Sequence, residues 1–304
     1  MSKKADQCII CSSKNIAPAM YLPNKFNDKL FHYLKCNDCR TIFIDPMPTE
    51  NDLNLMYSGT NDHYYLDEVE LFTPNTSYEK YHYRWHQLND FNSSKNLLKG
   101  KTFLDVGCGN GFYLHNAIQN GFEGKGIEFD SKFAEILRKK TDLEVYTVDE
   151  IEATGEKFDI IHVGHMLEHL TDPVGYMKRI LGLAHKDTMF IVDGPVESNA
   201  CLSRTVVDFF ATRNYKKKAK EYNEYDPQHL TFTNYDSQLI FFENLGLEKV
   251  KYTIAEQPWP LSNKFESKSP RAIFTGIVSK LSIALSNINM KQGNVFHYIG
   301  KLKS

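Results

Sequence analysis

The chain has 304 residues, of which 41% are hydrophobic and 24% are charged, as is typical of a globular protein long enough for two domains. Its formal net charge of -2 gives no overall field that would attract nucleic acid or an anionic membrane. No apolar run approaches the roughly 20 residues that span a bilayer, and the first residues lack the apolar core of a secretory signal. We therefore expect a cytoplasmic protein without a membrane partner.

Two pairs of cysteines stand near the N-terminus, and two residues separate the members of each pair. Cys8 and Cys11 form the first pair, and Cys36 and Cys39 form the second. In a chain expected in a reducing compartment, this spacing indicates a zinc site rather than a disulfide framework or unrelated buried cysteines. Four thiolates leave no open coordination position, so the metal would be structural. The sequence predicts a zinc ribbon over residues 1–48.

Residues 49–97 are rich in aromatic side chains and are predicted to form a helical linker. A short helix with Thr49 as its N-cap is expected first. Further along, Tyr78, Tyr81 and Trp85 recur at helical spacing. We favour packing of these rings on the protein core, with a lid over the cofactor or acceptor site as the alternative.

The most informative segment is an apolar strand that runs into a glycine-rich turn. Asp105 lies in this strand, and Gly107, Gly109 and Gly111 follow at alternate positions. A helix and a second apolar strand come next, and the second strand ends at Glu128. This βαβ arrangement is typical of a nucleoside-binding site. An ordinary strand–turn–helix connection would explain the glycines but not both acids.

The acid beside the first glycine indicates which nucleoside is bound. A carboxylate at Asp105 would repel the pyrophosphate of a dinucleotide. S-adenosylmethionine has no phosphate and carries an ammonium and a sulfonium group, so an acid at this turn is favourable. Glu128 is placed to accept hydrogen bonds from both ribose hydroxyls. The residues thus favour S-adenosylmethionine as the cofactor.

These segments resemble motif I and the following acidic motif of class I S-adenosylmethionine-dependent methyltransferases. The segment Phe158–Pro173 is similar to the fourth strand and following loop of a subgroup that includes quinone-ring and sugar O-methyltransferases. The resemblance spans about residues 100–255 and resumes at 294–304. It implies an α/β fold: a Rossmann-like seven-stranded sheet whose last strand is antiparallel, in a methyltransferase domain over residues 98–304. A zinc ribbon ahead of such a domain also resembles a known layout.

Strands and helices are predicted to alternate along this domain. Residues 256–293 have the character of a helical insertion, and the apolar residues of its helix form one stripe that could pack on the domain or on another chain. Strands are expected at 102–107, 125–129, 144–148, 158–163, 188–193, 247–254 and 295–302, and helices at 111–120, 131–141, 172–185 and 234–245.

The resemblance also implies individual contacts with the cofactor. Phe129 would neighbour the adenine ring, and Asp149 would meet the adenine amine, with a looser match because Glu150 is adjacent. His165 and Met166 would lie near the methionine moiety. The residues expected to bind the cofactor are Asp105, Gly107, Gly109, Gly111, Glu128, Phe129, Asp149, His165 and Met166.

His165, Glu168 and His169 follow the fourth strand at its carboxyl end, where open α/β sheets bind ligands. They spell an inverted zinc-protease motif. That motif needs a long helix, and Asp172-Pro173 interrupts one here, so we reject the protease interpretation. Glu168 and His169 either hold the loop and cap the next helix or act directly in catalysis.

His229 lies in a long loop between the fifth strand and the following helix. In the resembling family, a loop with histidine, phenylalanine and threonine caps the acceptor pocket. A structural histidine that ties down the loop is the alternative, but long loops in compact domains are more often functional. Because a hydroxyl acceptor must lose a proton, we predict His229 as the base, with His169 as the second choice.

The sequence therefore predicts methyl transfer to a hydroxyl of a small molecule, which the ribbon-plus-methyltransferase layout suggests is a sugar, nucleotide-sugar or polysaccharide intermediate. One alternative is C-methylation of a keto-deoxysugar nucleotide, in which Tyr222 and His229 would remove a proton. An RNA or protein modifier is another, although the ribbon has only a mild excess of cations and nucleic acid is an improbable partner. A non-catalytic scaffold is a third alternative. The oligomeric state stays open.

Overall fold

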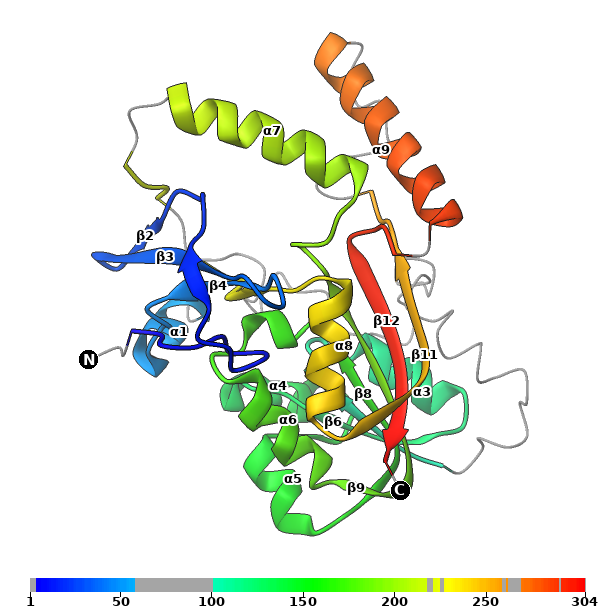
Figure 1. Ribbon diagram of the computed structural model, residues 1–304. Helices are drawn as coiled ribbons and strands as arrows, with labels where there is room; N and C mark the ends of the chain where they lie inside the picture. Colours follow the sequence, from blue (N-terminus) through cyan, green and yellow to red (C-terminus); the bar gives the residue numbers. More distant parts are fainter. Residues whose placement is uncertain are drawn as a thin grey trace.

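The computed structural model describes residues 4–57, 101–217, 221–224, 227–258, 261, 269–289 and 291–303 (Figure 1). The aromatic helix predicted around Tyr78, Tyr81 and Trp85 lies outside the described residues. The predicted short helix is α1 (Glu50–Tyr57). Thr49 begins it as expected, because its Oγ1 accepts a hydrogen bond from the Asp52 backbone N at 3.3 Å.

The larger unit is a sheet of seven strands in the order β11-β12-β9-β8-β5-β6-β7. Neighbouring strands are parallel except that β12 runs antiparallel to both β9 and β11. The predicted α/β fold with an antiparallel last strand is therefore confirmed. The strands are β5 (Thr102–Val106), β6 (Glu123–Ile127), β7 (Val145–Tyr146), β8 (Phe158–Gly164), β9 (Ala184–Pro195), β11 (Leu247–Ala255) and β12 (Val295–Leu302).

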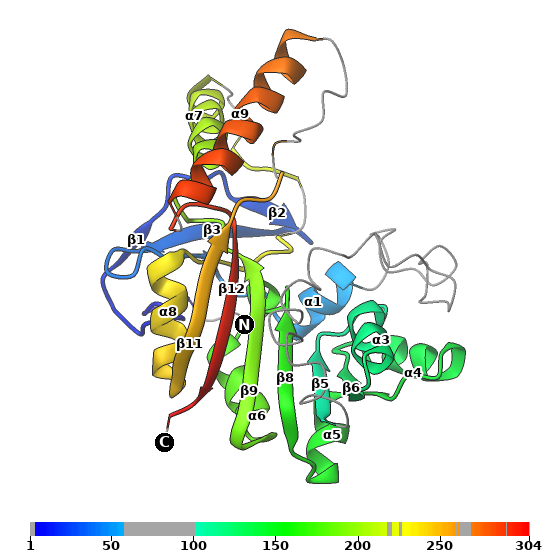
Figure 2. The same cartoon turned by 90° about the vertical axis from the view of Figure 1, so that its right-hand side faces the viewer.

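Helices cover both faces of this sheet (Figure 2). They are α3 (Phe112–Gln119), α4 (Ser131–Lys140), α5 (Val148–Thr154), α6 (Pro173–Leu181) and α8 (Tyr235–Asn244). Helix α5 was not predicted, and the strand expected over 144–148 shortens to β7. Thr147 and Glu150 form a reciprocal capping box that begins α5 directly after the strand.

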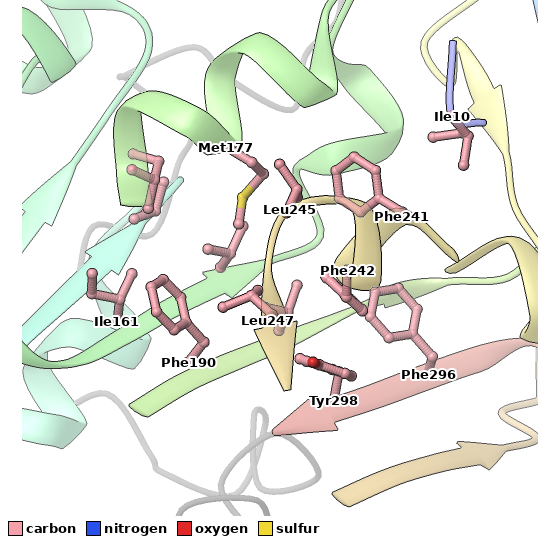
Figure 3. Packing of buried hydrophobic residues seen from close by; sticks show 14 of the residues in the cluster. Ile10, Ile161, Met177, Phe190, Phe241, Phe242, Leu245, Leu247, Phe296 and Tyr298 are labelled. Atoms are coloured by element: carbon pink, nitrogen blue, oxygen red, sulfur yellow. The ribbon is translucent and has the colours of Figure 1, made fainter. Parts of the chain in front are cut away.

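Two clusters of buried side chains fill the space between the sheet and its helices. Figure 3 shows the cluster on the α6 and α8 side, where the ring of Phe242 stacks on that of Tyr298 with centroids 3.9 Å apart. Ile10, from the N-terminal segment, belongs to this same cluster. Phe103, Leu114 and Leu137 belong to the cluster on the α3 and α4 side. The cysteine-bearing segment is therefore packed into the core of the larger unit.

The N-terminal segment forms a second sheet that includes a strand from the larger unit. Its strand order is β1-β3-β4-β10, with β2 paired to β3. Residue Phe43 of β4 pairs with Thr231 of β10 in antiparallel register. The strands are β1 (Ile16–Pro18), β2 (Asn24–Phe26), β3 (Lys29–Cys36), β4 (Ile42–Asp45) and β10 (Thr231–Phe232).

Two long helices project from one end of the molecule, α7 (Leu202–Lys217) and α9 (Pro270–Ile288) (Figures 1 and 2). Ser269 caps α9 and Pro270 begins it, within the segment predicted to be a helical insertion. The helices touch through an edge-to-face contact of Phe210 with Phe274. Within the described part of the chain, no helix is both long and apolar enough to cross a membrane.

Candidate active site

The glycine-rich turn connects the end of β5 to the start of α3. The backbone N–H groups of Gly107 and Cys108 both donate to the carbonyl of Ile127, each at 2.9 Å. Gly107 has φ 75° and Gly111 has φ 80°, the left-handed region that favours glycine. A Cβ at Gly111 would also lie 2.4 Å from the side chain of Leu143. The turn therefore depends on glycine for both its torsion angles and its packing.

Glu128 ties this turn to the end of β6. One of its carboxylate oxygens accepts from the backbone N of Gly109 at 3.1 Å, and the other accepts from Asp130 N at 3.2 Å. Burial raises the pKa of the Glu128 carboxyl. Its position beside the glycine turn is the one expected of a residue that binds a nucleoside ribose.

Behind the turn, a buried histidine bridges two buried carboxylates. His162 on β8 approaches Asp105 Oδ1 through Nδ1 at 2.7 Å and Asp193 Oδ2 through Nε2 at 3.1 Å. Its ring stacks on Tyr113, with centroids 3.8 Å apart. Burial alone would lower the pKa of His162, but the two carboxylates outweigh burial and raise it to about 9. The protonated imidazole and two carboxylates together carry one negative charge.

The sequence analysis did not identify His162 and Asp193. The available signal was a lone histidine inside the apolar strand segment Phe158–Gly164, at a position where alternation directs its side chain into the protein. An imidazole buried there needs polar partners. The partner from β5 is Asp105, which the sequence analysis had assigned to the cofactor.

Asp105 retains an oxygen suited to a cation. Its Oδ2 is buried and has no hydrogen-bond partner among the described residues. At Gly109, a Cβ would meet no atom of the described residues within 4 Å, so these residues leave open space beside the turn. A buried carboxylate oxygen, net negative charge and an open glycine turn fit S-adenosylmethionine and disfavour a phosphate-bearing ligand.

The other residues assigned to the cofactor lie after β6, after β8 and on α5, and of these Met166 is the one shown in contact with the turn. Phe129 is 58% exposed just after β6. Met166 contacts Gly107, where an added Cβ would lie 3.2 Å from the methionine sulfur. His165 follows β8 with φ 48°, and its backbone N donates to Asp193 O at 2.9 Å. Asp149 is exposed in the first turn of α5 and is paired with Arg179. Their roles stay predictions.

A second polar cluster joins the loop after β8 to the loop before β10. Glu168 and His169 lie in the short 3₁₀ helix η2 (Leu167–His169). The rings of His169 and His229 meet edge to face, with centroids 4.7 Å apart. One ligating atom from each of Glu168, His169 and His229 lies within 4.8 Å of the others. The fold thus brings together the three residues predicted for catalysis.

Each histidine in this cluster has its Nδ1 held by a neighbouring oxygen. His169 Nδ1 donates to the carbonyl of Gln228 at 2.9 Å, and His229 Nδ1 lies 2.7 Å from Glu197 Oε2. The sequence analysis missed Glu197, a buried acid just beyond β9. A carboxylate at Nδ1 orients an imidazole and directs Nε2 toward a substrate proton.

Burial and neighbouring charges shift the pKa values of these groups in different directions. Burial lowers the pKa of His169 to about 4 and raises that of Glu168 to about 7. Burial also opposes protonation of His229, but its bond to Glu197 dominates and raises the pKa of the imidazole. His229 is consequently the stronger base of the two histidines.

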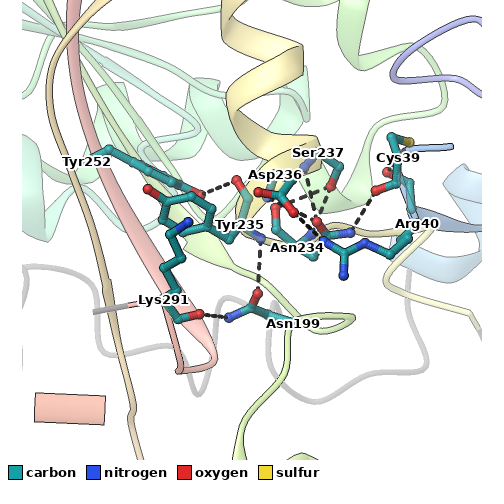
Figure 4. Close-up of polar contacts among 10 residues, drawn as sticks. Cys39, Arg40, Asn199, Asn234, Tyr235, Asp236, Ser237, Tyr252 and Lys291 are labelled. Atoms are coloured by element: carbon teal, nitrogen blue, oxygen red, sulfur yellow. Dashed lines mark hydrogen bonds and ion pairs between the residues drawn. The ribbon is translucent and has the colours of Figure 1, made fainter. Parts of the chain in front are cut away.

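The N-terminal sheet holds this cluster through the backbone. Ile44 N on β4 donates to Leu230 O at 3.0 Å, and Leu230 N donates to Glu168 O at 2.7 Å. Figure 4 shows a neighbouring contact, in which the Asn234 amide donates to the carbonyl of Cys39 at 3.0 Å. Leu230 and Asn234, which both follow His229, are therefore anchored to the cysteine-bearing segment.

The four N-terminal cysteines converge on one point. All are free, with Cys8 Sγ 3.6 Å from Cys39 Sγ and Cys11 Sγ 3.6 Å from Cys36 Sγ. Four sulfurs bound at about 2.3 Å to a tetrahedral zinc ion would lie roughly 3.8 Å apart. The arrangement therefore fits a zinc ion.

Comparison with known proteins agrees with this architecture. A model of the methyltransferase domain matches residues 78–252, which is more than half of the chain. The chain belongs to this family. The matched domain includes the glycine turn with Asp105 and Glu128, whose geometry fits S-adenosylmethionine as the methyl donor.

Two kinds of curated relative illustrate the range of the family. A ubiquinone biosynthesis O-methyltransferase from Actinobacillus pleuropneumoniae is 30% identical over 127 residues, covering 38% of this chain and 54% of the relative. A tRNA U34 carboxymethyltransferase from Campylobacter hominis is 35% identical over 130 residues, covering 37% and 45%. The chain thus spans about half the length of the curated relatives it matches.

Among solved structures, a SAM-dependent methyltransferase from Archaeoglobus fulgidus is similar to 74% of this chain and to all of its own chain. The TM-score is 0.46 at 15% sequence identity.

Proposed function

We propose that this methyltransferase acts on a hydroxyl group of a small molecule, with His229 as the general base. The observation that carries the proposal is the pairing of His229 with the buried carboxylate of Glu197 at 2.7 Å. This pair stands beside Glu168 and His169, on loops that follow strands of the sheet. A base held by a carboxylate is the arrangement required to deprotonate a hydroxyl during transfer.

In this proposal, the protein aligns the acceptor and removes its proton. S-adenosylmethionine, when bound, supplies a methyl group that is already activated for displacement, so alignment accounts for much of the catalysis. Glu197 keeps the Nδ1 proton of His229 in place, and Nε2 accepts the proton from the acceptor hydroxyl. His169, which stays neutral at physiological pH, packs edge to face against the base.

The small-molecule class is supported by the relative from Actinobacillus pleuropneumoniae, which is an O-methyltransferase of ubiquinone biosynthesis. The sugar, nucleotide-sugar or polysaccharide acceptor rests on the layout of a zinc ribbon before the methyltransferase domain, and the comparisons do not extend to it. C-methylation, with Tyr222 assisting His229, remains the alternative within the same class.

The tRNA-modifying relatives raise the prospect of a nucleic-acid acceptor. The charges of the ribbon do not favour it. Lys29 pairs with the buried Asp52 at 2.6 Å, and Arg40 pairs with Asp236. These cations are engaged within the protein rather than arranged as a basic face for phosphates. We therefore keep a small molecule as the proposed acceptor.

We also propose that the four cysteines bind one structural zinc ion, supported by their mutual distances. A four-thiolate site is closed, so the metal would stabilise the ribbon rather than take part in the reaction.

The decisive experiment incubates the protein with methyl-labelled S-adenosylmethionine and separate pools of quinols, nucleotide-sugars, glycans and tRNA. Label is expected in a small-molecule pool, and it should be lost with His229→Ala but retained with His32→Ala, which alters an exposed histidine on β3. Label confined to tRNA would contradict the proposed acceptor class, and unchanged labelling by His229→Ala would contradict the proposed base.

A further inference from the structure

Helix α9 has its polar and apolar faces reversed relative to an ordinary surface helix. Small residues are buried, among them Gly276, Ser279 and Ser282. The apolar stripe predicted from the sequence faces outward instead of packing on the domain. Its large side chains, each between 41% and 52% exposed, are Ile273, Phe274, Ile277, Leu281 and Leu285.

The polar face of α9 is held inward by specific hydrogen bonds. Ser282 Oγ donates to the buried carboxylate of Glu256 at 2.9 Å and accepts from the backbone N of Ser203 at 3.1 Å. The hydroxyl of Ser203 also donates to the same Glu256 oxygen. A helix rotated to bury its apolar stripe would take the Ser282 hydroxyl away from the buried Glu256 carboxylate, which is costly. The outward orientation of the stripe is therefore built into the fold.

Helix α7 extends the exposed apolar surface. Phe209 is 61% exposed and Phe210 is 48% exposed, and Phe210 meets Phe274 of α9 edge to face. The two helices project together from one end of the molecule, beyond the carboxyl end of β9 (Figures 1 and 2). Contiguous apolar surface of this kind marks an interaction site.

The charges of this projection are positive on balance, because the acid Asp208 on α7 is paired with Arg204 at 2.9 Å. Helix α9 carries Arg271 and Lys280 and no acidic residue, in a chain whose net charge is -2. At about 100° per residue, Arg271 and Lys280 fall on opposite edges of the apolar arc. Both are exposed, as is Arg213 on α7. An apolar helix face bordered by cations is the pattern of a helix that lies in the interface of an anionic bilayer.

We propose that α7 and α9 dock the enzyme onto an anionic phospholipid surface, with the apolar stripe of α9 inserted at the level of the headgroups. Neither helix spans the bilayer, which agrees with the absence of a spanning helix in the described residues. A second copy of this chain fits less well, because α9 offers no acidic residue to pair with the cations of a second α9.

The test measures co-sedimentation of the intact protein with vesicles of phosphatidylcholine, with or without phosphatidylglycerol. The wild-type protein should bind the phosphatidylglycerol vesicles and release them at high salt. The double variant Ile277→Ser/Leu281→Ser should bind these vesicles at least about tenfold more weakly than the wild-type protein. The matched control is Val250→Ser, which removes an apolar side chain that is 54% exposed on β11, away from these helices.

Arg271→Glu should lower binding to phosphatidylglycerol vesicles while leaving the melting temperature unchanged. Light scattering without vesicles tests whether a second copy of the chain covers these helices instead. If the wild-type protein is a dimer, if Ile277→Ser/Leu281→Ser converts it to a monomer and if no vesicle binding is seen, the proposal is overturned. Equal binding by the double variant, or equal loss with Val250→Ser, would also overturn it. The assay needs no methyl acceptor, so its outcome is independent of the proposed reaction.

Discussion

The two sides of the candidate active site are built in different ways. On the cofactor side, Asp105, the glycine turn and Glu128 lie within 24 residues of one another, and buried β8 and β9 support them. On the acceptor side, Glu168, Glu197 and His229 come from separate segments, and β4 of the N-terminal sheet is bonded to Leu230, which is bonded in turn to Glu168. The cofactor side is thus fixed by a local motif, whereas the acceptor side depends on long-range assembly.

Removal of zinc should have the largest effect on activity. It should impair the acceptor side more than the cofactor side. Binding of structural zinc contributes on the order of 10 kcal/mol to the folding of small domains, and Leu230 ties the ribbon to Glu168. Chelation or Cys36→Ser should therefore abolish methyl transfer while the protein retains part of its affinity for S-adenosylmethionine. Metal analysis and calorimetry measure this. A purified protein without zinc that is fully active would contradict the metal site.

His229→Ala tests the acceptor side alone. Loss of a general base should lower kcat by about 10²–10⁴-fold, with little change in the affinity for S-adenosylmethionine, because His229 is separate from the glycine turn. Steady-state kinetics and calorimetry are the measurements. Equal losses in kcat and cofactor affinity would show that the two sides are not independent. Glu197→Gln should act in the same direction and shift the pH profile of kcat.

Asp105→Asn tests the cofactor side alone. The variant removes a charge from the cofactor turn and leaves the imidazolium of His162 with one carboxylate. We expect the Kd for S-adenosylmethionine to rise about ten- to hundredfold and the free energy of unfolding to fall by about 3 kcal/mol. Calorimetry and urea unfolding measure these changes. The control is Glu135→Gln, which removes an exposed partner of Lys139 and should change neither quantity.

The pH dependence of stability should come mainly from the cofactor side. The folded pKa of His162 is about 9 and the unfolded value is about 6.5, so its stabilisation is complete below pH 6.5 and is lost as the pH rises through 9. The amount is about 3 kcal/mol. Urea unfolding should show this decline, and His162→Gln should flatten it. A wild-type curve that is level between these pH values would contradict a charged His162.

On the acceptor side, two shifts act in opposite directions. The raised pKa of Glu168, about 7, removes stability as the pH rises from 4.5 to 7. The lowered pKa of His169, about 4, removes stability as the pH falls from 6.5 to 4. Their contributions largely offset each other between pH 4.5 and 6.5. His169→Gln should therefore expose a decline in stability with rising pH in this range, measured by urea unfolding.

The smallest effect is expected at the exposed contact between the ribbon and α8. Arg40 and Asp236 are both more than half exposed, so their ion pair should contribute at most about 1 kcal/mol. Arg40→Ala should lower the melting temperature slightly, and high salt should reduce even that difference. A loss of activity from this variant would show that the ribbon positions His229 through charge as well as through the backbone.

The sequence was sufficient for the elements whose cause is local. The glycines and acids from Asp105 to Glu128 predicted the βαβ unit, because turn geometry and ligand charge act on neighbouring residues. Cysteine spacing predicted a cluster that the structure brings together. Helix α5 was missed because its start depends on a side-chain cap at Thr147 rather than on apolar periodicity.

Contacts between distant segments could not be predicted in this way. His162 and Asp193 were missed because an isolated histidine in an apolar strand does not identify its partners. The pairing of β4 with β10 joins residues nearly 190 positions apart, and no local pattern encodes it. The same holds for Glu197, whose role follows only from its distance to His229.

By itself, the sequence determined the α/β class, the glycine turn and the cysteine cluster, since torsion angles, charge and short spacing are properties of adjacent residues. Only the tertiary structure decided which carboxylate orients which histidine, that the ribbon is joined to the loop of His229, and that the apolar face of α9 points outward. These features depend on which buried polar groups find partners once the chain is packed, and that outcome depends on contacts between segments far apart in the chain.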